Sequence, residues 1–273
     1  MSHSPSSETI MPTAAVNPAE LAMCARKINM VFGGLHAVSD LDLDVATRTI
    51  HAIIGPNGAG KTTAVNALCG TLAPTSGQVW INGVTKPKWS PHEMAQYGLA
   101  RTFQNIRLFG GMTVLESVLV GGHGQHRSRL LDLIFKTRKA REEERAQVQK
   151  AQQLIAFVGL AAQLQDTEAR ALSYGNQRRV EIARALMSSP KVLVLDEPLA
   201  GMNVSEKDEI SELIFTIRAQ GTAILLIEHD MDVIRRLADT VTVLNRGKKL
   251  VEGTPAQVLA DAQVQSAYLG KVQ

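Results

Sequence analysis

The segment Thr49–Thr62 constrains the fold most tightly, because a compact apolar run leads into a glycine-rich turn and then into a helix-like segment. Within it, Gly55-Pro-Asn-Gly-Ala-Gly-Lys-Thr62 has the G-x4-G-K-[ST] spacing of a phosphate-binding loop. Glycines let successive N–H groups point inward around polyanionic oxygens, and the following helix adds the positive end of its dipole. We expect Lys61 to neutralise charge on the β- and γ-phosphates and the Thr62 hydroxyl to ligate Mg²⁺. The flanking strand and helix favour this nucleotide site over a glycine-rich turn without a ligand.

The composition fits one large globular domain or two small ones. Hydrophobic residues make up 45% of the 273 residues and charged residues 20%, so the material for a core is ample. The net charge of +3 is too small to indicate a nucleic-acid partner, and Cys24 and Cys69 are too few for a disulfide scaffold or a zinc site. No apolar run approaches the roughly 18 residues that span a bilayer, and no apolar block precedes the first basic residue, Arg26. We therefore expect a cytosolic protein without a signal peptide.

The order of the expected elements predicts an α/β fold. Alternation of Leu41, Leu43 and Val45 with smaller or charged residues indicates a half-exposed strand. Apolar runs predict further strands at Thr49–Ile54, Val79–Ile81, Val192–Leu195, Thr222–Glu228 and Val241–Leu244. Helical spacing predicts helices at Ser205–Gln220 and Met231–Ala238, which alternate with the last three of these strands. Such alternation implies a mainly parallel sheet covered on both faces.

Three stretches of the chain carry further signals: an N-terminal tail, a helical insert and the two ends of a late helix. Residues 1–19 are rich in Ser, Pro, Thr and Ala, and we expect a mobile tail, with a short partner-binding arm as the alternative. From Thr113 to Val158 the pattern is helical with a break at Gly121-Gly122, which predicts a helical insert. Ser205 with Asp208 predicts a capping box at the start of a late helix, and Gly221 predicts its end.

Two more motifs carry candidate chemistry. Asp196 and Glu197 follow the apolar strand at 192–195, at the carboxyl end where α/β proteins place ligands. Asp196 is suited to holding Mg²⁺ and Glu197 to polarising an attacking water, which favours nucleotide hydrolysis over a merely polar loop. Leu172-Ser-Tyr-Gly-Asn-Gln177 opens an amphipathic helix and predicts a second anion-binding N-terminus, with an ordinary capped helix as the alternative. Because one triphosphate already has a cradle at 55–62, a second such element suggests a site shared between two subunits.

Taken together, these motifs resemble the ATP-binding subunits of ABC transporters from about residue 21 to the end of the chain. Gly55–Thr62 resembles Walker A, Asp196-Glu197 resembles Walker B, and Leu172–Gln177 resembles the ABC signature. Gln104, in Arg101-Thr-Phe-Gln104, matches the Q-loop glutamine, and His229 matches the switch histidine. Alone, these two residues would indicate only satisfied polar side chains, but here they stand in the family's order and spacing.

The resemblance implies a fold and a set of site residues. The fold is a RecA-like P-loop NTPase core with a mainly parallel sheet, an antiparallel β subdomain and a helical signature subdomain. One ATP-binding domain would occupy residues 20–273, with a helical insert at about 105–185 and a C-terminal extension at about 245–273. The implied catalytic residues are Glu197 and His229, and the implied metal ligands are Thr62, Gln104 and Asp196. The implied ATP-binding residues are Phe32, Gly55, Pro56, Asn57, Gly58, Ala59, Gly60, Lys61, Thr62 and Thr63. The signature residues, acting on the facing subunit's ATP, are Ser173, Tyr174, Gly175, Asn176 and Gln177.

A narrower resemblance concerns the cargo. The segments Ala100–Phe109, Gly111–Glu116, Ile227–Met231 and the ending Gly253–Gly270 resemble branched-chain amino acid importers. The extra helical sequence at about 125–150 is similar to the longer of the two ATP-binding subunits that such importers carry. Urea and short-chain amide importers share much of this pattern. The implied cofactors are ATP and Mg²⁺. The implied partners are a second ATP-binding subunit, two transmembrane permease subunits and, indirectly, a solute-binding protein outside the membrane, with no nucleic acid. The expected location is the cytoplasmic face of the cytoplasmic membrane.

Some features leave alternatives open. Tyr174 stands where the signature commonly has Gly. Asn203 stands where the D-loop usually has Asp, and its amide cannot supply the negative charge of an Asp. Arg178 and Arg179 are first-turn helix residues, for which solvent exposure or a place near the permease or signature loop is expected. The rival functions are an ABC-type ATPase acting on DNA or ribosomes, a P-loop kinase or GTPase, and an exporter or lipid-transport ATPase. The first rival would require a long coiled coil or two cassettes in tandem. The second leaves the signature and His229 unexplained, and the third differs only in cargo.

Overall fold

A six-stranded sheet with the order β10-β9-β3-β8-β7-β6 forms the centre of the computed structural model, which describes residues 21–104, 106–125 and 138–269. Neighbouring strands from β9 to β6 run parallel, and β10 is antiparallel to β9. Every residue of β3, β7 and β8 is buried, as expected for apolar strands covered on both faces. The predicted α/β fold with a mainly parallel sheet is confirmed. The strands are β3 (Ile50–Ile54), β6 (Leu99–Arg101), β7 (Val192–Asp196), β8 (Ala223–Ile227), β9 (Thr240–Asn245) and β10 (Lys248–Gly253).

A second, antiparallel sheet of four strands has the order β2-β1-β4-β5. The predicted alternation in β2 is confirmed, because Leu41, Leu43 and Val45 are buried while Asp42 and Asp44 are partly exposed. A turn at Asn82-Gly83 joins β4 to β5. The four strands are β1 (Leu21–Phe32), β2 (Leu35–Ala46), β4 (Ser76–Ile81) and β5 (Val84–Thr85).

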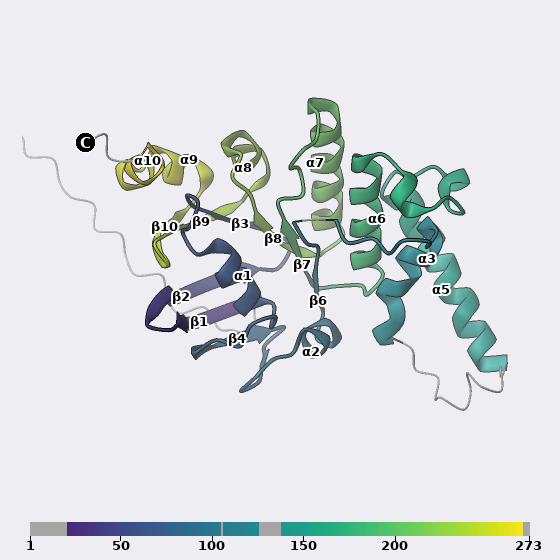
Figure 1. The fold of residues 1–273 in the computed structure, drawn as a ribbon, viewed down its shortest axis with the longest axis horizontal. Helices are drawn as coiled ribbons and strands as arrows, with labels where there is room; N and C mark the ends of the chain where they lie inside the picture. The colour runs from purple at the N-terminus through teal and green to yellow at the C-terminus, as the bar shows by residue number, and fades with distance from the viewer. Residues whose placement is uncertain (1–20, 105, 126–137, 270–273) are drawn as a thin grey trace, which may run out of the picture.

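The central sheet separates two hydrophobic cores. Alternate residues of one strand face opposite cores: Leu193 and Leu195 pack with the helices above the sheet in Figure 1, while Val192 and Val194 pack toward α1 and the antiparallel sheet. The predicted tail at 1–19 lies outside the described residues. The helices around the central sheet are α1 (Lys61–Leu68), α2 (Pro91–Gln96), α7 (Val204–Ala219), α8 (Met231–Leu237), α9 (Pro255–Ala260) and α10 (Ala262–Leu269).

A helical region extends from one end of the sheet, on the right in Figure 1. Its first helix is capped by Thr113, whose side chain forms a capping box with that of Glu116. The expected break at Gly121-Gly122 falls in a short 3₁₀ segment. Its helices are α3 (Val114–Leu119), η2 (Val120–Gln125), α5 (Arg138–Phe157), η3 (Ala162–Leu164), η4 (Ala169–Ala171) and α6 (Tyr174–Leu186).

The start of α7 differs from the prediction. Asn203, not Ser205, is the N-cap, and its side chain and that of Glu206 form a reciprocal capping box. The predicted partner, Asp208, is instead paired with Arg236. Asn is a strong N-cap and Glu at the third helical position completes the box, so this pair outcompetes the Ser-x-x-Asp alternative. The residue that departs from the D-loop pattern therefore has a local structural role.

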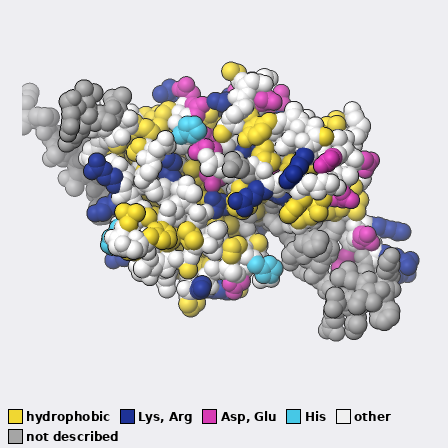
Figure 2. All heavy atoms as spheres, in the orientation of Figure 1, with side chains coloured by type: hydrophobic (Ala, Val, Ile, Leu, Met, Phe, Trp, Pro, Cys, Tyr) yellow, Lys and Arg dark blue, Asp and Glu magenta, His cyan; other side chains and the backbone are white. Residues whose placement is uncertain are grey.

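The surface carries charges of both signs. On the face shown in Figure 2, Lys and Arg side chains are interspersed with Asp and Glu, and no single sign dominates. Among the described helices, we find no stretch with the length and apolarity that crossing a bilayer requires.

Candidate active site

The loop between β3 and α1 can adopt its shape only with glycine at two points. A Cβ added to Gly55, at φ 153°, would lie 2.2 Å from the carbonyl oxygen of Leu244. A Cβ added to Gly60, at φ 98°, would lie 2.5 Å from the carbonyl oxygen of Ala37. Both distances are far below van der Waals contact, and both φ values disfavour residues with a side chain. The glycines therefore let β1–β2 and β9 pack tightly around the loop.

Lys61 begins α1 and folds back over this loop. Its Nζ donates hydrogen bonds to the carbonyl oxygens of Gly55 at 2.6 Å and Pro56 at 3.1 Å. Burial lowers the pKa of the Lys61 ammonium, while the carboxylates of Glu197 and Asp196 act in the opposite direction. The ammonium is thus held inside the loop, where it can attract an anion.

A cavity of about 540 Å³ adjoins the loop and Walker B. Most of the expected nucleotide-site residues line it, including Lys61, Gln104, Asp196 and Glu197. Phe32, Gly55, Pro56 and His229 are not in the lining; Phe32 lies at the β1–β2 turn and is 48% exposed. The lining residues are Leu35, His36, Ala37, Asn57, Gly58, Ala59, Gly60, Lys61, Thr62, Thr63, Gln104, Asp196, Glu197, Ile227, Arg246 and Gly247.

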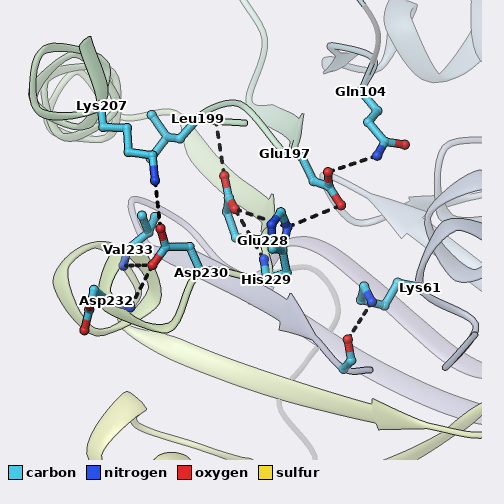
Figure 3. Close-up of polar contacts among 11 residues, drawn as sticks. Lys61, Gln104, Glu197, Leu199, Lys207, Glu228, His229, Asp230, Asp232 and Val233 are labelled. Carbon is cyan, nitrogen blue, oxygen red and sulfur yellow. Dashed lines mark hydrogen bonds and ion pairs between the residues drawn. The ribbon is translucent and has the colours of Figure 1, made fainter. Parts of the chain in front are cut away.

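Two polar groups from distant segments converge on Glu197 (Figure 3). Gln104 Nε2 donates a 2.9 Å hydrogen bond to Glu197 Oε2, and His229 Nδ1 lies 3.6 Å from Glu197 Oε1. The backbone of Glu197 is in the left-handed region, at φ 46°, and its N–H donates to the carbonyl of Ile227. A non-glycine residue held in this region is strained, and such residues cluster at functional sites. Three of the expected residues are therefore brought into one cluster.

Asp196 is held by an arginine that the sequence analysis did not assign. Arg101 Nη2 donates to Asp196 Oδ2 at 2.8 Å, and Arg101 Nη1 donates to Asn66 Oδ1 at 2.7 Å. Arg101 belongs to the same short motif as Gln104, but its contact depends on β6 lying beside β7, which the sequence does not reveal. The pair fixes the carboxylate at the edge of the cavity.

The oxygen groups at the cavity suit a hard cation. The Thr62 hydroxyl, the Asp196 carboxylate and the Gln104 amide all line the same cavity, and oxygen donors of this kind are those that Mg²⁺ prefers. Mg²⁺ bound with ATP typically takes only one or two protein ligands and completes its shell with phosphate oxygens and water. The residues present therefore fit a nucleotide-bound Mg²⁺.

The signature residues lie apart from this cavity. None of Ser173–Gln177 is in its lining. Ser173 is exposed and caps α6 by accepting a bond from the N–H of Asn176, while Tyr174 is 42% exposed. Gln177 Nε2 donates to the carbonyl of Leu172 at 2.8 Å, which closes the turn before the helix. The structure thus brings the Walker motifs, Gln104 and His229 together within one chain, but not the signature.

Glu228 is a further residue that the sequence analysis missed. It is 1% exposed, and its carboxylate accepts hydrogen bonds from the backbone N–H groups of Leu199 and His229, both at 3.3 Å (Figure 3). Burial raises the pKa of the Glu228 carboxyl; the two backbone hydrogen bonds oppose the shift. Glu228 therefore connects the loop after Walker B to the expected switch histidine. Its place directly before His229 was the available signal.

Comparisons with known proteins show which families this chain resembles. Residues 38–200 match the ABC transporter family, and residues 248–272 match the family described as branched-chain amino acid ATP-binding cassette transporter. The chain is 41% identical over 245 residues to the high-affinity branched-chain amino acid transport ATP-binding protein BraF of Pseudomonas aeruginosa, covering 89% of this chain and 96% of BraF. It is 40% identical over 243 residues to the LivG protein of Escherichia coli K12, which has the same description, covering 89% and 95%.

Solved structures of ATP-binding cassettes have the same fold. The ADP conformation of MJ1267, an ATP-binding cassette of an ABC transporter, superposes with a TM-score of 0.80 and 34% identity, over 92% of this chain and 99% of that one. A nucleotide-free cassette from an ABC transporter gives a TM-score of 0.80 and 33% identity, over 92% and 100%.

Proposed function

The chain belongs to the ATP-binding cassettes of ABC transporters, and we propose that it hydrolyses ATP to drive import of branched-chain amino acids across the cytoplasmic membrane. The observation that carries the proposal is the convergence of Gln104 and His229 on Glu197 beside the phosphate-binding loop. Glu197 would polarise the attacking water, and His229 would contact the γ-phosphate. Because both neighbours already touch Glu197, a bound γ-phosphate can change the position of the base through either one.

Binding would precede hydrolysis at the loop. The N–H groups of residues 57–62 would bind the phosphates, and Lys61 would exchange its two carbonyl contacts for phosphate oxygens. Thr62, Asp196 and Gln104 would hold Mg²⁺, which offsets phosphate charge when it is bound. Phe32 is exposed at the β1–β2 turn, and its ring is free to stack on adenine.

A second ATP-binding subunit would complete the site. Ser173 is exposed at the start of α6, and the signature does not line this chain's own cavity. We propose a head-to-tail pair in which each signature faces the other subunit's phosphate-binding loop. ATP would close the pair, and hydrolysis would let it open.

The permease would dock on a groove between the central sheet and the helical region. This groove has a volume of about 440 Å³ and is lined in part by Phe103, Arg107, Phe109, Arg184 and Ser188. Phe109 is 54% exposed, and the Arg107 guanidinium lies 4.5 Å from the centroid of the Phe103 ring. An apolar and cationic groove next to Gln104 is suited to a short helix from a membrane partner, and it would hold the chain at the cytoplasmic face. A solute-binding protein outside the membrane would act through that partner.

The experiment is reconstitution with the native permease and second subunit in lipid. Addition of binding protein loaded with leucine, isoleucine or valine should stimulate ATP hydrolysis, and unloaded binding protein should not. The matched control is the same complex with Glu197→Gln in this chain. Stimulation by urea or an amide but not by leucine would keep the ATPase and remove the cargo. No stimulation by any solute, in a complex that hydrolyses ATP, would contradict coupling to import.

A further inference from the structure

The first turn of α6 contains a buried charge. The position of Arg178 in the first turn predicts exposure to solvent or a place near the permease or signature loop, but its side chain is 0% exposed. Its neighbour Arg179 bonds the carbonyl of Val158 and the carboxylate of Glu209, away from the active site. Of these two adjacent arginines, only Arg178 is therefore directed toward the segment at 103–104. The expectation of solvent exposure is wrong for Arg178 because the segment at 103–104 covers this face of α6.

Arg178 and Glu181 hold this segment through its backbone. Arg178 Nη1 donates to the carbonyl of Phe103 at 2.9 Å, and Arg178 Nη2 donates to the carbonyl of Gln104 at 3.1 Å. Glu181 Oε1 accepts from the N–H of Phe103 at 3.2 Å. The two side chains also pair with each other at 2.5 Å, and Glu181 is 1% exposed. Three hydrogen bonds thus tie the backbone of two consecutive residues, Phe103 and Gln104, to one turn of α6.

Stability alone is a weak reason for such a pair. Hydrophobic residues of similar volume often replace a buried ion pair without loss of stability, because both charges lose their hydration. Arg178 Nε is in fact buried without a hydrogen-bond partner among the described residues. In contrast, a guanidinium fork that reaches two successive carbonyls fixes direction as well as distance. The geometry is therefore better suited to positioning the 103–104 backbone than to stabilising the core.

We propose that Arg178 and Glu181 are positioning residues that set the Gln104 side chain against Glu197. The Arg178–Glu181 pair lies directly after the signature segment, which ends at Gln177. Any movement of the signature helix is then transmitted to the backbone of Gln104, and through its side chain to the base. The functional part of this inference rests on the proposed roles of Gln104 and Glu197 in MgATP hydrolysis.

The main test replaces both charges at once in the full chain. In the variant Arg178→Met with Glu181→Leu, no charge of the pair is left buried and unpaired. Arg184, whose guanidinium lies 3.7 Å from Glu181, loses that ion pair but retains its bond to the carbonyl of Arg107. Hydrogen exchange at the Phe103 amide should accelerate by about tenfold, since the amide loses its carboxylate acceptor. The matched control is Arg179→Met, which removes an arginine of the same helix that bonds a carbonyl and a carboxylate elsewhere; exchange at Phe103 should stay at the wild-type rate.

A second readout measures the effect on the candidate metal site. Titration with a fluorescent ATP analogue, in EDTA and in Mg²⁺, gives the gain in affinity due to Mg²⁺. In the double variant the gain in affinity due to Mg²⁺ should be about tenfold smaller than in wild type. The affinity for the analogue in EDTA should stay the same, because the phosphate-binding loop is intact. Gln104→Ala should reduce the Mg²⁺ gain by the same factor. A triple variant that combines Gln104→Ala with Arg178→Met and Glu181→Leu should show no further reduction. A merely structural pair would not show this non-additivity.

The outcomes separate this inference from the proposed function. Unchanged Phe103 exchange in a folded double variant would overturn the positioning role. An unchanged Mg²⁺ gain in the double variant, together with a loss in Gln104→Ala, would overturn its effect on the site. An unchanged gain in Gln104→Ala would instead contradict the metal role of Gln104. If the double variant does not fold, Arg178→Lys keeps the buried charge and cannot reach both carbonyls, and an unchanged Mg²⁺ gain in Arg178→Lys would overturn the positioning role.

Discussion

The hydrogen bond of 2.9 Å from Gln104 Nε2 to Glu197 Oε2 joins the segment after β6 to the end of β7, across 93 positions of the chain. Both residues follow parallel neighbouring strands, whose carboxyl ends meet at one edge of the sheet. The Glu197 carboxylate is therefore held by the amide side chain of Gln104 as well as by its place at the end of β7. Its other oxygen faces His229, so Glu197 is approached from two sides.

Glu197→Gln should retain ATP binding and nearly abolish hydrolysis. The amide keeps the shape of the side chain but cannot accept a proton from the attacking water. General-base catalysis is worth about 10² to 10⁴ in rate, so kcat should fall by at least about 10²-fold. Steady-state hydrolysis by the purified transporter, with nucleotide affinity measured in parallel, checks this. Near-normal turnover would move the base elsewhere, with His229 the next candidate.

Lys61→Ala should weaken MgATP binding strongly. The polyphosphate would lose the point charge that now rests on the carbonyls of Gly55 and Pro56, and hydrogen bonds to charged groups are worth about 1.5–3 kcal/mol, or about 10- to 100-fold in affinity. Titration with a fluorescent ATP analogue measures the loss. Lys207→Ala is a suitable control, because Lys207 pairs with Asp230 outside the cavity lining. Equal affinity in Lys61→Ala and wild type would exclude this loop as the nucleotide site.

Asn203→Ala and Asn203→Asp should separate the local role of this residue from its role between subunits. Asn203 caps α7, so loss of the cap should lower the free energy of unfolding by about 1 kcal/mol, whereas Asp caps equally well. Urea denaturation of the three proteins measures both effects. If Asn203→Ala is as stable as wild type, the cap does not contribute. If Asn203→Asp changes hydrolysis in the complex at unchanged stability, the amide itself tunes communication between sites.

The predictable and unpredictable parts of the structure have different physical origins. The strands at β3, β7 and β8 were predictable because burial on both faces demands a continuous apolar run, and such a run is visible locally. The burial of Arg178 was not, because the covering carbonyl belongs to Gln104, 74 positions away.

Choices between near-equivalent local signals were also unpredictable. The cap at Asn203 rather than Ser205 depends on which carboxylate reaches back to the N-cap, and two Glu/Asp candidates have the required spacing. Likewise, the Walker motifs could be identified from spacing, but the contact of Arg101 with Asp196 needs the order of strands in the sheet. Sequence therefore identified most of the candidate site, and tertiary packing supplied the residues that hold it.

Glu228 should make stability depend on pH. Burial raises its pKa above the ordinary value of 4.5, so the folded protein holds the proton more tightly than the unfolded chain does. Its contribution is fully present below about pH 4.5 and is lost as the pH rises through the raised folded pKa. The stability of wild type relative to Glu228→Gln should therefore fall as the pH rises from about 4.5, as measured by urea denaturation at a series of pH values. A difference that does not change with pH would contradict the assignment.

In the assembled transporter this chain should hydrolyse ATP, but the isolated chain should bind no branched-chain amino acid. Recognition of leucine would need a pocket that pairs a carboxylate and an amine with an apolar side chain. The cavity at the candidate site is instead lined by phosphate-loop backbone, Lys61, Gln104 and two carboxylates. Selectivity should therefore lie in the external binding protein and the permease, and leucine without the binding protein should leave the hydrolysis rate of the transporter unchanged. Calorimetry that detects micromolar leucine binding to the isolated chain would refute this division of labour, because the ATPase subunit would then itself contribute to the choice of cargo.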